Sequence, residues 1–173
     1  MNILAVIPAR HASSRFPGKP LALVAGVPMI QRVYTRVQDA QACQKVVVAT
    51  DDERIAEAVR NFGGEVVMTS DKCPNGTVRC HEAAEQLEAN GEEFQAVLNI
   101  QGDEPFVHPE QIEQLADMLR NPDAAVVTLA KSMPADPEIE SPHRVKVVRN
   151  MSGRALMFSR NPLPHGEGPW LHH

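Results

Sequence analysis

The sequence predicts an α/β fold with a doubly wound, mostly parallel sheet. The short aliphatic run at residues 3–7 predicts a buried strand, the β-branched run at 45–50 predicts a strand that is buried on both faces, and 94–100 predicts a further strand. Segments with apolar residues at helical spacing lie between these runs, and strands that alternate with helices are typical of a parallel sheet. Right-handed crossovers then favour the order 3-2-1-4 for the first four strands.

The predicted first strand, residues 3–7, leads into a basic loop at 8–20. The first 38 residues hold five basic side chains and no carboxylate, although the net charge of the chain is -5. Arg10, Arg15 and Lys19 lie on the loop with Ser13 and Ser14. Fixed cations at the carboxyl end of a strand suit a polyphosphate. A solvated basic loop would have the same composition.

The next elements alternate as the fold requires. Residues 30–37 have an apolar face at helical spacing, 45–50 form the second strand, 55–62 a second helix and 65–69 the third strand. Thr50 and Glu53 match a capping box at the start of the second helix. Asp51 could contact a ribose there, but capping explains this acidic segment more simply, so we leave Asp51 out of the predicted site.

Two polar segments follow the third and fourth strands. Gly76 and Thr77 lie at a predicted helix start, with Arg79 in its first turn; this arrangement fits a phosphate or nucleobase site and fits an ordinary helix start equally well. Residues 101–105 follow the strand at 94–100 and place Asp103 in a turn between Gly102 and Pro105. A carboxylate there suits Mg²⁺ bound to substrate phosphates, and a plain acidic turn is the alternative.

The predicted strand order brings these segments together. Strands one and four are neighbours at the switch point of the sheet, so the basic loop and Asp103 should face each other. Cations and a metal-binding carboxylate in one crevice suit a nucleoside triphosphate with magnesium.

The remaining sequence predicts a helix from residue 108, a fifth strand at 124–130, a proline-rich connection at 133–143 and a hairpin from 145–148 and 155–158. Arg160 follows the hairpin and either reaches an acidic substrate or lies at the surface. We expect one domain over residues 1–173, with an αβ core at 1–131 and a hairpin and tail at 132–173.

Composition excludes several classes of protein. The acidic excess and the low aromatic content, 4%, argue against nucleic-acid binding. Neither a run of membrane-spanning length nor a signal peptide is present in the sequence, so we expect a cytoplasmic protein without a membrane partner. Three cysteines without a close pair indicate free thiols in a reducing compartment.

Taken together, the motifs resemble those of the 3-deoxy-D-manno-octulosonate (KDO) cytidylyltransferase family, also called CMP-KDO synthetases. The matching segments run in family order: Ile7-Pro8-Ala9-Arg10 with Ser13, Arg15 and Pro17-Gly18-Lys19-Pro20; Pro28-Met29-Ile30; Val47-Val48-Ala49-Thr50-Asp51; Gly76-Thr77 with Arg79; Gln101-Gly102-Asp103-Glu104-Pro105; Val145-Lys146-Val147-Val148; and Phe158-Ser159-Arg160. CMP-sialic acid synthetases share the opening loop but match the later segments less clearly.

The resemblance implies a fold of the nucleotide-diphospho-sugar transferase (Rossmann-like) type and transfer of CMP from CTP to KDO, with release of pyrophosphate, for lipopolysaccharide biosynthesis. It implies that Ala9, Arg10, Ser13 and Lys19 hold the CTP phosphates, with Arg15 assisting. It also implies that Arg79 and Gln101 lie near the cytidine, that Asp103 binds Mg²⁺ and that Arg160 faces the sugar acid. Arg10, Lys19 and Asp103 would be the catalytic groups, because such a reaction needs charge neutralisation and in-line positioning.

Two departures from the family pattern stand out. Asn75 and Val78 replace a hydroxyl and a carboxylate that the family usually has beside Arg79. Family members also continue for about half as long again past residue 173, and that part carries homodimer contacts, further sugar contacts and another metal-binding aspartate. We therefore expect a C-terminally incomplete member. The alternatives are a non-catalytic CTP-binding module, a CMP-sialic acid synthetase-like enzyme and an interaction domain that keeps only the α/β core.

Overall fold

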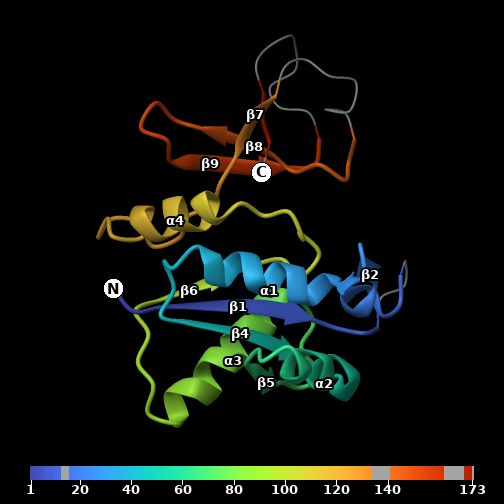
Figure 1. Cartoon of the computed structure of the whole chain (residues 1–173). Helices are drawn as coiled ribbons and strands as arrows, with labels where there is room; N and C mark the ends of the chain where they lie inside the picture. The colour runs from blue at the N-terminus through green and yellow to red at the C-terminus, as the bar shows by residue number, and fades with distance from the viewer. Residues whose placement is uncertain (13–15, 134–140, 162–169, 173) are drawn as a thin grey trace. The chain divides into compact units, whose positions relative to one another are not determined.

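A computed structural model describes residues 1–12, 16–133, 141–161 and 170–172 (Figure 1). The chain divides into two compact units, Met1–Ala125 and Val126–His173. The expected organisation, one domain with its core at residues 1–131, stays a prediction.

The first unit is built on a four-stranded parallel sheet. Its strands, in spatial order, are β5 (Val66–Met68), β4 (Lys45–Thr50), β1 (Ile3–Ala9) and β6 (Ala96–Asn99). All three pairings are parallel, with Val6 opposite Val47 on one side and Leu4 opposite Val97 on the other. This is the predicted order 3-2-1-4, so the α/β class and the switch point between strands one and four are confirmed.

Four α-helices connect and cover the strands: α1 (Met29–Asp39), α2 (Glu53–Asn61), α3 (Gly76–Ala89) and α4 (Pro109–Met118). Between β1 and α1 lie a short 3₁₀ helix, η1 (Lys19–Leu21), and a small hairpin of β2 (Leu23–Val24) and β3 (Val27–Pro28). Among the residues that the structure describes, no helix has both the length and the apolar character needed to cross a membrane.

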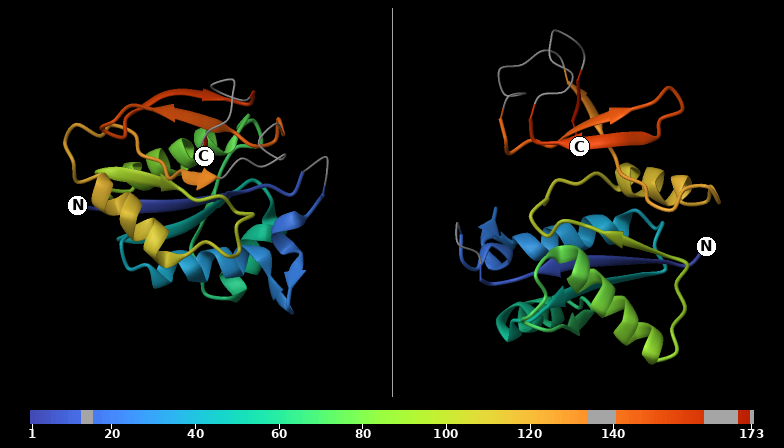
Figure 2. Two further views of the ribbon diagram at one scale, coloured as in Figure 1. Left: turned by 90° about the horizontal axis from the view of Figure 1, so that it is seen from above. Right: turned by 180° about the vertical axis from the view of Figure 1, so that it is seen from behind.

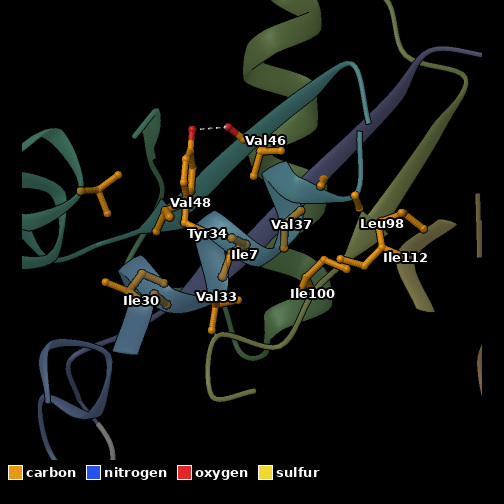
Figure 3. Close-up of a cluster of buried hydrophobic side chains, with 14 of the residues drawn as sticks. Ile7, Ile30, Val33, Tyr34, Val37, Val46, Val48, Leu98, Ile100 and Ile112 are labelled. Atoms are coloured by element: carbon orange, nitrogen blue, oxygen red, sulfur yellow. Dashed lines mark hydrogen bonds between the residues drawn. The ribbon is translucent and has the colours of Figure 1, made fainter. Parts of the chain in front are cut away.

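The central strands β1 and β4 are buried on both faces, as their apolar runs predict. Ile3, Ile7 and Val48 pack with α1, α2 and α4, and Figure 3 shows Ile7 and Val48 beside Val33 and Tyr34 of α1. Leu4 and the other alternate side chains pack against α3 in a second cluster. α1 and α3 accordingly lie on opposite sides of the sheet (Figure 1; Figure 2, right), which confirms the doubly wound arrangement.

Two local predictions are wrong. Thr50 does not cap α2: Asp52 is the N-cap, and its Oδ1 accepts a hydrogen bond from the Arg54 backbone N–H at 3.0 Å, while Thr50 Oγ1 accepts one from the Asp52 N–H. The predicted strand at 124–130 is also absent; this segment is irregular, and a short strand begins only at Lys131. A β-branched run forms a strand only where a partner strand is available.

The second unit is a small antiparallel sheet. Its order is β7 (Lys131–Met133), β10 (Trp170–His172), β8 (Lys146–Arg149) and β9 (Ala155–Ser159). β8 and β9 form the predicted hairpin, and Asn150 Oδ1 accepts hydrogen bonds from the N–H groups of Ser152 and Arg154 in its turn. Most of the expected proline-rich connection and of the tail lies outside the described residues.

Candidate functional site

A cavity of about 580 Å³ opens within the first unit, at the carboxyl ends of β1 and β6. This is the switch point, where parallel α/β sheets bind ligands. The residues that line the cavity are Pro8, Ala9, Arg10, Phe16, Lys19, Pro20, Cys73, Pro74, Asn75, Gly76, Arg79, Gln101, Gly102 and Asp103. The basic loop, the start of α3 and the turn after β6 therefore meet around one space.

Lys19 and Asp103 are in direct contact at this cavity. Lys19 Nζ lies 2.6 Å from Asp103 Oδ2, and the two side chains are 36% and 52% exposed. Because these residues are far apart in sequence, only the predicted strand order brings them together. Their expected juxtaposition is confirmed.

The loop that carries Lys19 is closed by a backbone contact. The Gly18 N–H donates to His11 O at 2.9 Å, and Gly18 has φ +71, a conformation that favours glycine. A Cβ at Gly18 would lie 3.0 Å from His11 Nε2. Gly18 thus allows the chain to turn and to present Lys19 at the start of η1.

Other predicted residues of the basic loop divide into two groups. Ala9, the last residue of β1, and Arg10, which follows it, line the cavity, and the Arg10 side chain is exposed. Ser13 and Arg15 lie outside the described residues, so their roles stay predictions. Phe16 also lines the cavity, and the sequence interpretation missed it, since a single aromatic residue between cations carries no distinctive pattern.

The turn after β6 packs closely on the end of β1. A Cβ on Gly102 would lie 3.0 Å from Pro8 O, a backbone atom with little freedom to move. Gln101 lines the cavity beside Gly102, and its Nε2 lies 3.4 Å from Asn99 Oδ1 in a long contact. Glycine at position 102 therefore brings Gln101 and Asp103 to the cavity.

Arg79 enters the site from the first turn of α3. Its side chain is only 4% exposed, its Nη1 donates to Thr69 Oγ1 at 2.6 Å, and its Nη2 lies 3.3 Å from Asp51 Oδ1. The sequence interpretation missed Thr69 and left out Asp51, because it assigned the acidic segment to helix capping. The position of Asp51 directly after a buried strand was the available signal.

Cys73 lines the cavity as a buried, protonated thiol. Its Sγ–H donates to Glu82 Oε2 at 3.0 Å, and this hydrogen bond, followed by burial, raises the pKa of the thiol. Burial raises the pKa of Cys43 to about 11 and that of Cys80 to about 12. All three cysteines are free, as expected, and the described part of the chain holds no group of three or more His, Cys, Asp or Glu residues suited to a metal ion.

Arg160 belongs to the second unit, and its Nη1 donates to Pro142 O at 2.8 Å. Its expected contact with a sugar acid stays a prediction.

Comparison with known proteins identifies the family. Residues 4–168 match the family model described as cytidylyltransferase. The chain is 48% identical to a 3-deoxy-manno-octulosonate cytidylyltransferase of Parabacteroides distasonis, with 97% of this chain and 66% of that protein covered. It is 47% identical to the mitochondrial 3-deoxy-manno-octulosonate cytidylyltransferase of Arabidopsis thaliana, with 96% of this chain and 56% of that protein covered.

Among solved structures, a CMP:2-keto-3-deoxy-manno-octonic acid synthetase complexed with CTP matches with a TM-score of 0.88 and 38% identity, over 100% of this chain and 71% of that one. The chain spans at most 66% of the two curated relatives described above, which is just under two thirds of their length. Sequence and fold agree, and the chain belongs to the cytidylyltransferase family.

Proposed function

We propose that this chain carries the nucleotide-binding site of an enzyme that transfers CMP from CTP to KDO and releases pyrophosphate. The observation that carries the proposal is the cavity in which Lys19 contacts Asp103 and Arg10 adds a second cation. Support comes from the relatives, which are named 3-deoxy-manno-octulosonate cytidylyltransferases, and from the similar structure, which is complexed with CTP.

In the proposed reaction, the anomeric hydroxyl of KDO attacks the α-phosphorus of CTP, and pyrophosphate leaves. Such a transfer needs positive charge against the phosphates and alignment of the reacting groups, and no protein nucleophile. Arg10 and Lys19 would supply the charge, with Ser13 and Arg15 as further proposed contacts. The guanidinium of Arg10 suits two phosphate oxygens at once, whereas the ammonium of Lys19 acts as a point charge.

We propose Mg²⁺ as the cofactor, held by Asp103. The carboxylate is half exposed, and its Oδ2 is in contact with Lys19 Nζ. Because Mg²⁺ commonly binds through one or two carboxylates together with substrate phosphates, a single aspartate beside a phosphate site fits the ion without a cage of protein ligands. When bound, the ion would offset the negative charge of the phosphates. We expect its affinity to depend on the nucleotide.

The cytidine end of the substrate would lie near Arg79 and Gln101, which both line the cavity. Arg160 would face the sugar acid. Following the family resemblance, we further propose a role in lipopolysaccharide biosynthesis, a cytoplasmic location, a homodimeric full-length protein, and no nucleic-acid or membrane partner. The three free thiols are consistent with a reducing compartment.

The decisive experiment supplies the chain with CTP, Mg²⁺ and KDO and measures pyrophosphate release, beside a version extended past residue 173. Pyrophosphate release by the chain would support the proposed enzymatic activity. Release by the extended version alone would show that the transfer of CMP also requires the added part. CTP binding without release in either version would indicate a non-catalytic CTP-binding module. Failure of millimolar CTP to raise the melting temperature would contradict both proposals.

Two variants test the residues that carry the proposal. Lys19→Met should weaken CTP binding, and Asp103→Ala should remove the magnesium dependence of that binding. Arg36→Met is the matched control for loss of a cation, because Arg36 is exposed on α1 and does not line the cavity. Undiminished, magnesium-dependent binding in Asp103→Ala would exclude the metal role of Asp103.

A further inference from the structure

Arg79 combines a permanent positive charge with almost complete burial. Its side chain is 4% exposed, yet it lines the cavity. A buried guanidinium is costly unless opposite charge and hydrogen-bond acceptors surround it. The residues around Arg79 therefore determine whether the fold can accommodate its buried charge, and they determine the direction in which the guanidinium N–H groups point.

Two segments at the carboxyl edge of the sheet hold the guanidinium. Thr69, just after β5, accepts a 2.6 Å hydrogen bond from Nη1, and Asp51, just after β4, lies 3.3 Å from Nη2. The Thr69 N–H in turn donates to Thr50 O at 2.8 Å, so the two segments are tied together beside the cavity. The guanidinium is thus held at neighbouring strand ends by one hydrogen bond and one ion pair.

Asp51 is available for this contact because its neighbour caps the helix. Asp52 accepts the α2 N-cap hydrogen bond and pairs with Arg54. Asp51 Oδ1 is buried, and within the described ranges it has no hydrogen-bond donor; its contact with Arg79 is an ion pair without hydrogen-bond alignment. Glu82 also feels the charge of Arg79, but the Cys73 thiol and the Ser70 N–H are its main partners. Among the described residues, Asp51 is therefore the carboxylate that forms an ion pair with Arg79.

We propose that Asp51 and Thr69 are positioning residues that orient the Arg79 guanidinium toward the base of the nucleotide, and that this orientation favours CTP over a bare triphosphate. The proposal rests on the proposed function and deepens it. Without Asp51 the guanidinium would keep Thr69 as its anchor and lose its neutralising charge. The ion pair attracts Nη2 toward Asp51, so without it the guanidinium could turn about its single hydrogen bond to Thr69, and planar hydrogen bonding to a base depends on the orientation of that plane.

The test compares the dissociation constants of CTP and inorganic tripolyphosphate by calorimetry, because only CTP carries a base. In Asp51→Asn we expect the affinity for CTP to fall about tenfold, the effect of one charge-assisted contact, and the affinity for tripolyphosphate to stay unchanged. Thr69→Val should act in the same direction. The double variant Asp51→Asn with Arg79→Met should bind CTP no more weakly than Arg79→Met alone, because both changes act through Arg79.

Asp52→Asn is the matched control, since it removes the adjacent carboxylate and should leave the ratio of the two constants unchanged. A purely structural role of Asp51 would lower the melting temperature without changing that ratio, and such a result overturns the proposal. If Asp51→Asn does not fold, Asp51→Glu keeps the charge and displaces it by one methylene; an unchanged ratio there overturns the proposal equally. A wild-type protein that binds tripolyphosphate as tightly as CTP would instead contradict the base contact within the proposed function.

Discussion

The two units of the molecule use different means to hold a sheet together. In the first unit, β1 is buried on both faces, and its alternate side chains pack into two separate hydrophobic clusters. In the second unit, β9 is largely exposed, with Leu156 63% accessible to solvent, and the buried side chains of β8 include a lysine, Lys146. A parallel sheet covered by helices has two apolar faces, whereas an antiparallel sheet can leave one face in water.

Lys146 shows how polar contacts help to hold the described part of the second unit together. It is 2% exposed, and its Nζ donates to the carbonyl oxygens of Ser141, Arg144 and Arg160 at 2.8, 3.1 and 2.8 Å. Three donors of an ammonium thus meet three acceptors, which ties the segment before β8 to the end of β9. The comparison predicts that shortening a buried apolar side chain destabilises the first unit most. In the second unit, the loss of one polar group should be destabilising.

The largest effect should come from Ile7→Ala. Ile7 is fully buried between the sheet and α1 (Figure 3), so we expect a loss of about 2–5 kcal/mol in the free energy of unfolding of the first unit. Leu156→Ala is the matched control in β9 and should change stability by less than about 0.5 kcal/mol. Urea unfolding measures both, and equal losses would show that β9 is as well packed as β1.

Lys146→Met should have the next largest effect. The substitution keeps the volume but removes the donor of three part-buried hydrogen bonds, which should cost about 1–3 kcal/mol within the second unit. Amide hydrogen exchange should then accelerate in β8 and β9 and stay unchanged in β1 and β4. Lys131→Met, an exposed lysine of the same unit, provides the control. Acceleration across both units would show that they do not unfold separately.

The same contrast explains which parts of the fold the sequence predicted. Residues 45–50 read correctly as a strand because parallel strands buried on both faces are continuously apolar, and the crossover rules then supplied the sheet order. Residues 124–130 have a similar composition, but no strand among the described residues pairs with them, and composition alone does not show whether a partner exists.

The juxtaposition of Lys19 and Asp103 could be predicted because the topology of the sheet determines it. Lys19 and Asp103 meet because strands one and four are neighbours. The environment of Arg79 could not be predicted, since Thr69 and Asp51 approach it through tertiary packing, and the local sequence offered a competing explanation in helix capping. An error of two residues in the cap position was enough to remove Asp51 from the predicted site.

The smallest predicted effect is a loss of stability at low pH, and we again expect it in the first unit. Among the described residues, the carboxyls with clearly lowered pKa values, Asp52 and Glu82, both belong to the first unit. The hydrogen bond from Arg54 is the main cause that holds the pKa of Asp52 below its usual value. Because the folded pKa is depressed, the stabilisation is complete above the unfolded value of about 3.9 and is lost as the pH falls through the folded pKa.

Asp52→Ala should therefore cost about 1 kcal/mol at pH 7, the usual contribution of an N-cap, and progressively less as the pH approaches 3. Asp52→Asn retains a capping oxygen but lacks the charge that pairs with Arg54, so it should be less stable than wild type at pH 7 by less than Asp52→Ala and should lose less stability in acid. Urea midpoints of the first unit at the two pH values measure both variants. A penalty for Asp52→Ala that is as large at pH 3 as at pH 7 would show that the cap, and not the charge of Asp52, carries the stabilisation.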